Sequence, residues 1–307
     1  MWFHVRITEE CNLKCTYCYA KNYDRTSAMP FDLFQEIIVK IKSLPKCKKD
    51  VCILYLSGGE PLLHSEFENM LAHAYPLFDR IHILSNGLLL EKNLTLIKKH
   101  SDKTFVQISV DGDEAVNDQI RGNGTYRKAE SALKLLKQNR IKHWISYTVS
   151  KQNRECGQNI VNLARNTDSV FNNITPYIGS PDLMLDFNEW EIFKNEISDY
   201  AESIDFPMIH SPNACGFNYK CGEYFGGITF NPNGSVTGCA RNQEKLYSLG
   251  DLPRILIETP KLMNETCMRE KWKDVPDFKN MQELRERRFF MKRNGALSLN
   301  KLANIPW

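Results

Sequence analysis

Three cysteines stand close together near the start of the sequence, in the stretch EECNLKCTYCYA. Cys11, Cys15 and Cys18 follow the spacing C-x3-C-x2-C, and thiolates are ligands of both zinc and iron–sulfur clusters. Structural zinc takes four ligands, and no fourth lies close by in the sequence. A [4Fe-4S] cluster needs one thiolate for each iron, so three cysteines leave one iron open to a substrate or cofactor. The spacing therefore favours an open cluster over zinc.

A second group of cysteines lies in the last third of the chain. Its members are Cys215, Cys221, Cys239 and Cys267. Four thiolates fully satisfy a metal ion or a cluster, and zinc fits this count as well as a [4Fe-4S] cluster does. We therefore expect an open site at the start of the chain and a closed site near its end.

A glycine-rich turn follows the second predicted strand. The stretch LSGGEP places Gly58 and Gly59 directly before Glu60. Glycine lets the backbone approach a ligand closely, and a carboxylate can bind an ammonium group. The alternative is an ordinary glycine turn.

Short polar side chains also lie at the ends of the third and fourth predicted strands. Asn86 lies in LSNG, and Ser109 and Asp111 lie in ISVDG. Ser and Asp side chains can hydrogen-bond neighbouring hydroxyl groups, although Asn86 and Asp111 would also suit simple turns. In parallel α/β folds the chemistry lies at the carboxyl ends of the strands, so these residues should lie near the first cysteines.

Short apolar runs rich in β-branched residues alternate with longer helical patterns. The predicted strands are Trp2 to Thr8, Val51 to Ser57, Arg80 to Ser85, Phe105 to Asp111, His143 to Val149 and Ser169 to Pro176. The predicted helices are Phe31 to Lys42, Ser65 to Tyr75, Glu91 to His100, Tyr126 to Asn139, Glu155 to Asn166 and Asn188 to Ile204. Regular alternation implies parallel strands with right-handed crossovers, and six such units give a partial (β/α)6 barrel of the TIM type.

The pattern changes near residue 206, where a domain boundary is expected. A small cysteine-rich domain follows, and within it ITFNPNGSVTGC predicts a β-hairpin because Asn-Gly favours tight hairpin turns. The predicted fold class is thus α/β, a partial TIM-like barrel followed by a small domain with a hairpin.

The composition is that of a globular protein without a membrane span. Of the 307 residues, 42% are hydrophobic and 25% are charged, and no apolar run approaches the ~18–20 residues that a span needs. Polar residues after Met1 interrupt any signal sequence, so a cytoplasmic location is expected. In that reducing compartment, ten cysteines favour metal or catalytic sites over disulfides.

The charge of the chain is nearly balanced overall. A net charge of +3 gives no argument for nucleic acid as a partner. Residues 269–307 hold ten Lys and Arg against five Asp and Glu. This basic tail would attract an acidic peptide, RNA or lipid headgroups, but a solvated surface is the simpler interpretation.

Taken together, the three cysteines and the strand-end motifs resemble the radical S-adenosylmethionine (SAM) enzymes, whose signature has an aromatic residue before the last cysteine, here Tyr17. The resemblance implies that Cys11, Cys15 and Cys18 hold the cluster that cleaves SAM. The open iron would bind the amino and carboxylate groups of SAM. Reductive cleavage would then give a 5'-deoxyadenosyl radical, which abstracts hydrogen from a substrate.

The resemblance extends to the residues that bind SAM. In this family the Gly-Gly-Glu motif holds the amino group, and the Ser and Asp after the fourth strand bind the ribose. The segment NDQIRGNGTYRKA is similar to the family's H-D-x-x-R-G-x-G-T-F, with Asn117 where His is usual, and Arg121 would reach a carboxylate or form a salt bridge at a helix start. The implied cofactor-binding residues are Tyr17, Gly58, Gly59, Glu60, Asn86, Ser109, Asp111 and Arg121.

The cysteine-rich region resembles the auxiliary-cluster domain of the SPASM/twitch subfamily. ITFNPNGSVTGC is similar to its I-D-P-D-G-x-V-x-P-C, and SLGDL is similar to its L-G-N-L. No cysteine follows Cys267, so the shorter twitch type is implied, with one auxiliary [4Fe-4S] cluster on the four late cysteines. The implied division is a radical SAM barrel over residues 1–206, a twitch domain over 207–270 and a basic helical tail over 271–307.

Members of this subfamily mature ribosomally made peptides or act on small molecules. An auxiliary cluster that accepts an electron favours a net oxidation, so we expect a peptide maturase that closes a C–C, C–S or C–O bond. One alternative is a dehydrogenase or epimerase of aminoglycosides or sugars, with Cys156 as the hydrogen donor at a predicted helix start, where a thiolate is favoured. A third is a non-catalytic iron–sulfur or zinc protein.

The expected partners follow from these hypotheses. The substrate would be a precursor peptide or a small molecule, and the electron donor a flavodoxin or ferredoxin. Because the cysteine motif begins at residue 11, a peptide would be bound by the barrel, the tail or a separate peptide-recognition protein.

Overall fold

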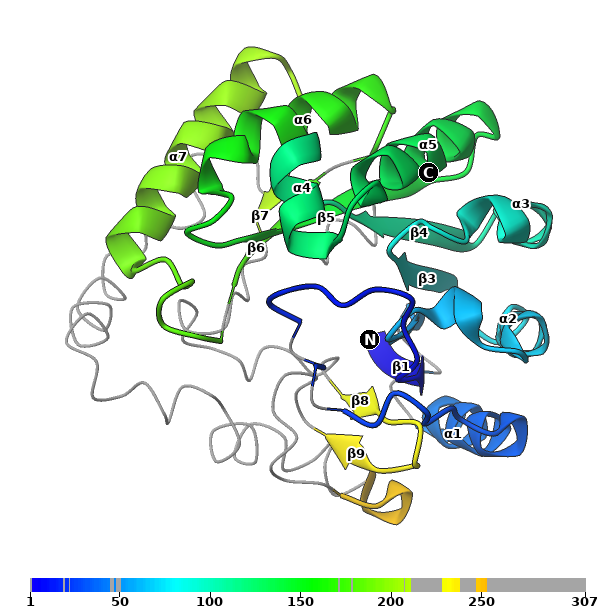
Figure 1. Ribbon diagram of the computed structural model, residues 1–307. Coiled ribbons are helices and arrows are strands. Elements are labelled where there is room, and N and C mark those ends of the chain that lie inside the picture. Colours follow the sequence, from blue (N-terminus) through cyan, green and yellow to red (C-terminus); the bar gives the residue numbers. More distant parts are fainter. Residues whose placement is uncertain are drawn as a thin grey trace.

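The described residues form an α/β structure around one nine-stranded sheet (Figure 1). The computed structural model describes residues 2–18, 20–21, 23–44, 47, 51–170, 172–177, 179–206, 208–210, 228–237 and 247–252. The four late cysteines and the basic tail lie outside the described residues.

Seven parallel strands make up most of this sheet. They are β1 (Trp2–Thr8), β2 (Ile53–Gly58), β3 (Arg80–Ser85), β4 (Thr104–Ser109), β5 (His143–Val149), β6 (Asn172–Pro176) and β7 (Met208–His210). They lie in the order β7-β6-β5-β4-β3-β2-β1, and every neighbouring pair is parallel. The predicted partial barrel is confirmed. Strand β7 was not predicted, because its three residues are too few to show a period.

Helices follow most of the strands and lie along the outer side of the curved sheet (Figure 1). They are α1 (Phe31–Ser43), α2 (Phe67–Ala74), α3 (Leu90–Lys99), α4 (Glu114–Arg121), α5 (Thr125–Gln138), α6 (Gly157–Asn166) and α7 (Phe187–Ser203). Six of them match the predicted helices. Helix α4 was missed because its sequence, EAVNDQIR, is short and mostly polar, and only Asn117 and Ile120 are buried.

The hydrophobic core lies between the helices and alternate residues of each strand. In β1, Phe3, Val5 and Ile7 are fully buried in the same cluster as Phe34 and Ile38 of α1. Successive side chains of a strand point to opposite faces, so His4, Arg6 and Thr8 lie on the other face. This pattern leaves polar groups near the carboxyl end of the strand, beside the loop that follows it.

The predicted hairpin is present, and it extends the sheet beyond β1. Strands β8 (Thr229–Phe230) and β9 (Val236–Thr237) are antiparallel. Gly234 has φ 80° in the turn between them, a conformation that glycine adopts without strain. Strand β8 pairs in parallel with β1, with His4 opposite Thr229.

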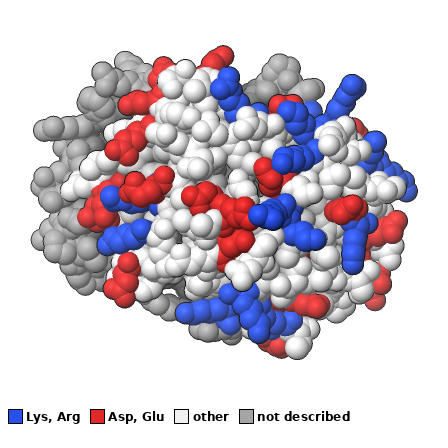
Figure 2. All heavy atoms as spheres, turned by 45° about the horizontal axis from the view of Figure 1, so that its top comes forward, with Lys and Arg blue, Asp and Glu red and all other residues white. Residues whose placement is uncertain are grey.

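The surface of the described residues carries both signs of charge. Figure 2 shows acidic and basic side chains interspersed over the face that it presents, in agreement with the small net charge. None of the helices in the described part of the chain combines the length and apolar character needed to cross a membrane.

Candidate active site

The three early cysteines lie in one loop, residues 9–18, which directly follows β1 and is called the cysteine loop below. Cys11, Cys15 and Cys18 are free thiols and are half-buried. The loop is held by a hydrogen bond from the Thr16 N–H to the Ile120 carbonyl of α4 (2.9 Å). The structure therefore brings the predicted cluster ligands together at the carboxyl edge of the sheet.

The pKa values of two of these three thiols are raised, chiefly because the thiols are partly buried. Burial raises the pKa of the Cys11 thiol, and the nearby Glu60, Cys15 and Cys18 raise it further. Burial also raises the pKa of Cys15, which the Arg121 charge opposes. Metal cations displace such protons and take up the thiolate charge.

The placement of the three thiols distinguishes a site for a single metal ion from a site for an iron–sulfur cluster. Among the described residues, no group of three or more His, Cys, Asp or Glu side chains is placed to hold a single metal ion. In a [4Fe-4S] cluster each thiolate binds a different iron, so the sulfurs need not converge on one point. The donor set of the cysteine loop therefore fits a three-thiolate cluster.

Gly58 and Gly59 let the backbone at the end of β2 pack against the backbone at the start of the cysteine loop. The Gly59 N–H donates to the Thr8 carbonyl (2.8 Å), and the Glu60 N–H donates to the Glu10 carbonyl (2.7 Å). A Cβ on Gly58 would lie 2.0 Å from the Thr8 oxygen, and one on Gly59 would lie 2.2 Å from the Glu10 oxygen. The close backbone approach predicted for these glycines is thus an approach to the cysteine loop itself.

The Glu60 carboxylate is fully buried beside this loop. It accepts hydrogen bonds from the Ser85 hydroxyl (2.9 Å), the Asn86 N–H (2.7 Å) and the Leu62 N–H (3.2 Å). Burial raises the pKa of Glu60 to about 7, against the effect of these hydrogen bonds. A buried carboxyl that receives only neutral donors in this part of the chain is well suited to accept hydrogen bonds from an amino group of a ligand.

Asn86 connects the same edge to the cysteine loop. Its side-chain N–H donates to the Asn12 side-chain oxygen (2.8 Å), and its own oxygen accepts the Leu88 N–H (3.0 Å). Sequence reasoning missed Asn12. The position of Asn12 directly after Cys11 was the feature of the sequence that could have marked it as a site residue.

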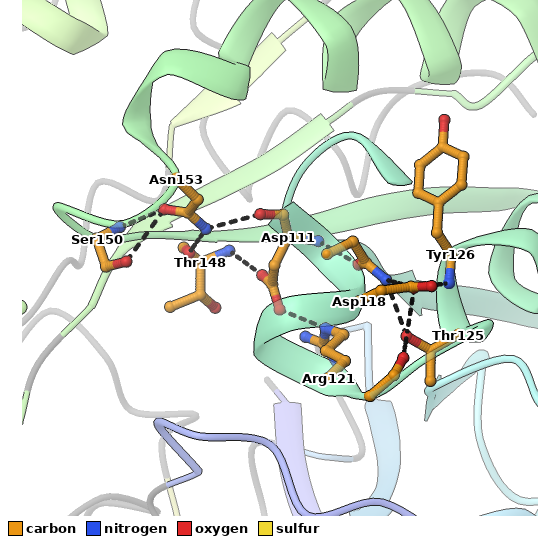
Figure 3. Close-up of polar contacts among 10 residues, drawn as sticks. Asp111, Asp118, Arg121, Thr125, Tyr126, Thr148, Ser150 and Asn153 are labelled. Carbon is orange, nitrogen blue, oxygen red and sulfur yellow. Dashed lines mark hydrogen bonds and ion pairs between the residues drawn. The ribbon is translucent and has the colours of Figure 1, made fainter. Parts of the chain in front are cut away.

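A second polar cluster lies beyond the ends of β4 and β5 (Figure 3). The Asp111 side chain is fully buried. One of its oxygens accepts from the Arg121 Nε, and the other accepts from the Thr148 N–H (3.1 Å). Arg121 forms a salt bridge with Asp111, as the alternative expected, but it is the last residue of α4 and does not lie at a helix start. Its partner is a strand-end carboxylate.

The surroundings of Arg121 keep its guanidinium protonated. Burial alone would lower its pKa, but the paired Asp111 carboxylate outweighs burial, so the pKa of Arg121 is raised. The guanidinium stays protonated, and it lies close enough to Cys15 to oppose the rise in that thiol's pKa.

Two buried asparagines that the sequence did not single out as ligands hold Asp111 from both sides. The Asn117 side-chain oxygen accepts the Asp111 N–H (3.0 Å), and its amide donates to the Thr125 hydroxyl (3.0 Å). The Asn153 amide donates to the Asp111 carbonyl (2.9 Å) and to the Thr148 carbonyl (3.0 Å). Asn117 stands where the resembling family has His, and it satisfies both of its polar ends within the protein.

The remaining predicted residues lie at the same edge. The Tyr17 ring packs against Tyr177, with centroids 5.4 Å apart. Its hydroxyl is buried, and burial, followed by the Asp111 charge, raises its pKa. Ser109 ends β4, half-buried, and pairs with Ser146 of β5.

Cys156 does not have the properties expected of an activated thiol. It is buried directly before α6. Burial raises its pKa, and the charges of Asp113 and Glu155 add to this effect, while a backbone hydrogen bond at Asp113 opposes it. The expectation that the helix start favours a thiolate here is therefore wrong.

Three curated proteins show what this chain is similar to. It is 28% identical over 165 residues to the sporulation killing factor maturation protein SkfB of Bacillus subtilis (53% of this chain, 39% of the relative). It is 28% identical over 150 residues to the Fe-coproporphyrin III synthase of Methanosarcina barkeri (48% and 36%). It is 25% identical over 260 residues to the antilisterial bacteriocin subtilosin biosynthesis protein AlbA of B. subtilis (80% and 56%). The chain thus spans between a third and three fifths of the length of these relatives.

The fold is shared with a solved structure. Streptococcus suis SuiB, in its crystal structure bound to the precursor peptide SuiA, matches with a TM-score of 0.69 and 15% identity, over 91% of this chain and 66% of SuiB. At this identity the likeness concerns the fold.

The family match covers the first five strands of the barrel and the residues predicted for the SAM site. Residues 5–164, more than half of the chain, match the Radical SAM superfamily, and the maturation and biosynthesis relatives agree with the predicted subfamily. This chain is therefore a member of the Radical SAM superfamily, with SAM and a [4Fe-4S] cluster as its cofactors.

Proposed function

We propose that this protein reductively cleaves SAM at the cysteine loop and uses the resulting radical to modify a ribosomally made peptide. One arrangement carries the proposal: three free thiols, the Glu60 carboxylate and the Arg121 guanidinium all lie around one loop at the carboxyl edge of the sheet. When bound, a reduced [4Fe-4S] cluster supplies the electron that splits SAM into methionine and a 5'-deoxyadenosyl radical.

The residues of this edge divide the binding of SAM between them. Glu60 accepts hydrogen bonds from the amino group of SAM, Arg121 binds its carboxylate, and Ser109 hydrogen-bonds the ribose. Gly58 and Gly59 hold the Glu60 segment against the cysteine loop, with Asn86 as a second connection. Tyr17 closes the site beside Asp111. Burial of these groups excludes water, which strengthens each polar contact.

The second cysteine set would carry a closed auxiliary cluster. We keep the division into a barrel over residues 1–206, a twitch domain over 207–270 and a basic tail over 271–307. Four thiolates from Cys215, Cys221, Cys239 and Cys267 would leave no open iron, so this cluster would accept an electron rather than cleave SAM.

A peptide substrate is supported by the names of two relatives. SkfB is a maturation protein of a sporulation killing factor, and AlbA is a bacteriocin biosynthesis protein. The SuiB structure that shares this fold holds a precursor peptide. A ferredoxin or flavodoxin would deliver the electron, and a separate protein would aid peptide recognition.

The cofactor chemistry is tested by anaerobic reconstitution of the full chain, followed by incubation with SAM and dithionite. The expected result is 5'-deoxyadenosine and methionine in equal amounts. If no 5'-deoxyadenosine forms while the first cluster is intact by electron paramagnetic resonance, the enzyme hypothesis fails and a non-catalytic iron–sulfur protein is favoured.

The substrate is tested with the products of the encoding locus. A short precursor peptide from that locus should lose two hydrogens in mass spectrometry when incubated with the active enzyme. A locus that holds sugar or tetrapyrrole biosynthesis genes instead, together with turnover of the corresponding small molecule, would overturn the peptide assignment.

A further inference from the structure

The Asp111 carboxylate is already engaged on both of its oxygens. Arg121 Nε donates to one oxygen and the Thr148 N–H to the other. Its backbone N–H and carbonyl are bonded to Asn117 and Asn153. Side chain and backbone of Asp111 are thus fixed by four different residues, two from α4, one from β5 and one from the loop after β5 (Figure 3).

The end of α4, which carries Arg121, is hydrogen-bonded to the cysteine loop. The carbonyl of Ile120, directly before Arg121, accepts the Thr16 N–H of the loop (2.9 Å). The Arg121 charge also acts on Cys15. The end of α4 therefore connects the Asp111 cluster to the loop that carries the thiols.

We propose that Asp111 is a positioning residue, which fixes the Arg121 guanidinium against the cysteine loop, and that it is not a ligand of the ribose. The inference rests on the proposed binding of SAM at this loop. The Asp111 side chain is fully buried, and Arg121 and the Thr148 N–H already occupy the approach to each of its oxygens, so a ribose hydroxyl would reach it only if these contacts moved. Arg121, by contrast, donates to Asp111 through Nε, which leaves its outer N–H groups for a ligand.

Asp111 also gives Arg121 a defined orientation. A free arginine side chain has many rotamers, and ordering it on ligand binding costs free energy. An arginine that is paired beforehand loses less of that freedom when SAM binds. Removing Asp111 should therefore weaken SAM binding only through Arg121.

A double-mutant cycle tests this directly. Asp111→Asn, Arg121→Gln and the double variant are reconstituted with iron and sulfide, and SAM binding is measured at equilibrium by titration calorimetry without reductant. Each single variant should bind SAM about tenfold or more weakly, and the double variant should bind no more weakly than Arg121→Gln alone. Losses that multiply in the double variant would show an independent contact of Asp111 and overturn the proposal.

A conservative variant keeps the test valid if Asp111→Asn fails to fold. Arg121→Lys retains the positive charge but replaces the fork of N–H donors by a single ammonium. It should bind SAM less tightly than the wild type, with unchanged iron content and an unchanged unfolding midpoint. Wild-type affinity in Arg121→Lys would show that a fixed guanidinium is not required and would overturn the proposal.

The chain offers a control arginine in α5, which pairs with the first residue of α4. Arg127 pairs with Glu114 (2.6 Å), and both side chains are largely exposed. Arg127→Gln should leave SAM affinity within about twofold of the wild type, since exposed pairs contribute little. A loss equal to that in Arg121→Gln would mean that any arginine on these helices matters, against the positioning role. Wild-type protein that binds no SAM at all would instead refute the proposed function.

Discussion

Two buried carboxylates lie on either side of the cysteine loop, and they differ in what they pair with. Glu60 receives its three hydrogen bonds from neutral groups, and burial raises its pKa to about 7. Asp111 pairs with Arg121 and with one backbone N–H. The protein supplies a cation to one carboxylate and leaves the other for a ligand. This contrast supports the proposal that Glu60 acts on SAM directly, whereas Asp111 acts through Arg121.

Removal of a thiol from the first cysteine set should eliminate SAM cleavage, the reaction that Glu60 and Asp111 are both proposed to support. Cys15→Ala is expected to abolish SAM cleavage, because two thiolates cannot hold the three-ligand cluster. The measurement is 5'-deoxyadenosine formation by liquid chromatography with dithionite as reductant. Cys239→Ala is the matched variant in the second set, and it should retain some cleavage without productive turnover. Equal loss in both variants, with the first cluster still present, would contradict this division of roles.

Removal of the Glu60 charge should give the next largest effect. Glu60→Gln is expected to weaken SAM binding by about tenfold or more, because an ionised acceptor for the amino group becomes a neutral amide. Calorimetric titration without reductant gives the affinity, and iron content shows whether the cluster is intact. Unchanged affinity would indicate that Glu60 is only a structural link to Ser85 and Asn86.

Replacement of Asp111 and replacement of Glu60 should have different effects on the free energy of unfolding. Asp111→Asn leaves the buried Arg121 charge without its partner, which should lower the free energy of unfolding by about 3 kcal/mol or more. Glu60→Gln resembles the protonated form that already exists near pH 7, so its unfolding free energy should stay within about 1 kcal/mol of the wild type. Denaturant unfolding of the cluster-free proteins at pH 7 measures both. Equal losses would remove the contrast between the two sites.

The pH dependence of Glu60 gives the smallest predicted change. Its pKa is about 7 in the folded protein, against about 4.3 in an unfolded chain. Glu60 therefore contributes stability at low pH, and this contribution is lost as pH rises from about 4 to about 7. In the proposed role of Glu60, SAM binding needs the ionised form, so affinity should rise up to about tenfold between pH 6 and pH 8. The rise attributable to Glu60 should be absent in Glu60→Gln, and a rise of equal size in that variant would assign it to another group.

The sequence predicted the strands better than the contacts between their ends. The bounds of β1, β3 and β5 match the predicted ranges because apolar and β-branched residues mark each strand. Helix α4 was missed because its eight residues carry little apolar pattern, although Asp113 caps it by accepting the Val116 N–H.

The site was predicted as a set of residues but not as a network. The cysteines, Glu60, Asn86 and Asp111 were identified from motifs, yet Asn12 and Asn153, which bond to Asn86 and Asp111, were not. Nothing in a single sequence distinguishes a buried Asn153 from an exposed asparagine, because burial arises only when separate strand ends meet. The role of Gly59 likewise depends on Glu10, which is distant from it in sequence.

The pairing of β8 with β1 has a consequence for how the protein folds. His4 and Thr229 are neighbours in the sheet, so one side of the first strand acquires its partner only after most of the chain has been synthesised. Contacts between such distant residues slow folding, and an unpaired strand edge can associate with other chains in the meantime. Assembly of the strand that leads into the cysteine loop is thus completed late, and cluster insertion should be most efficient in chains that have already closed this edge.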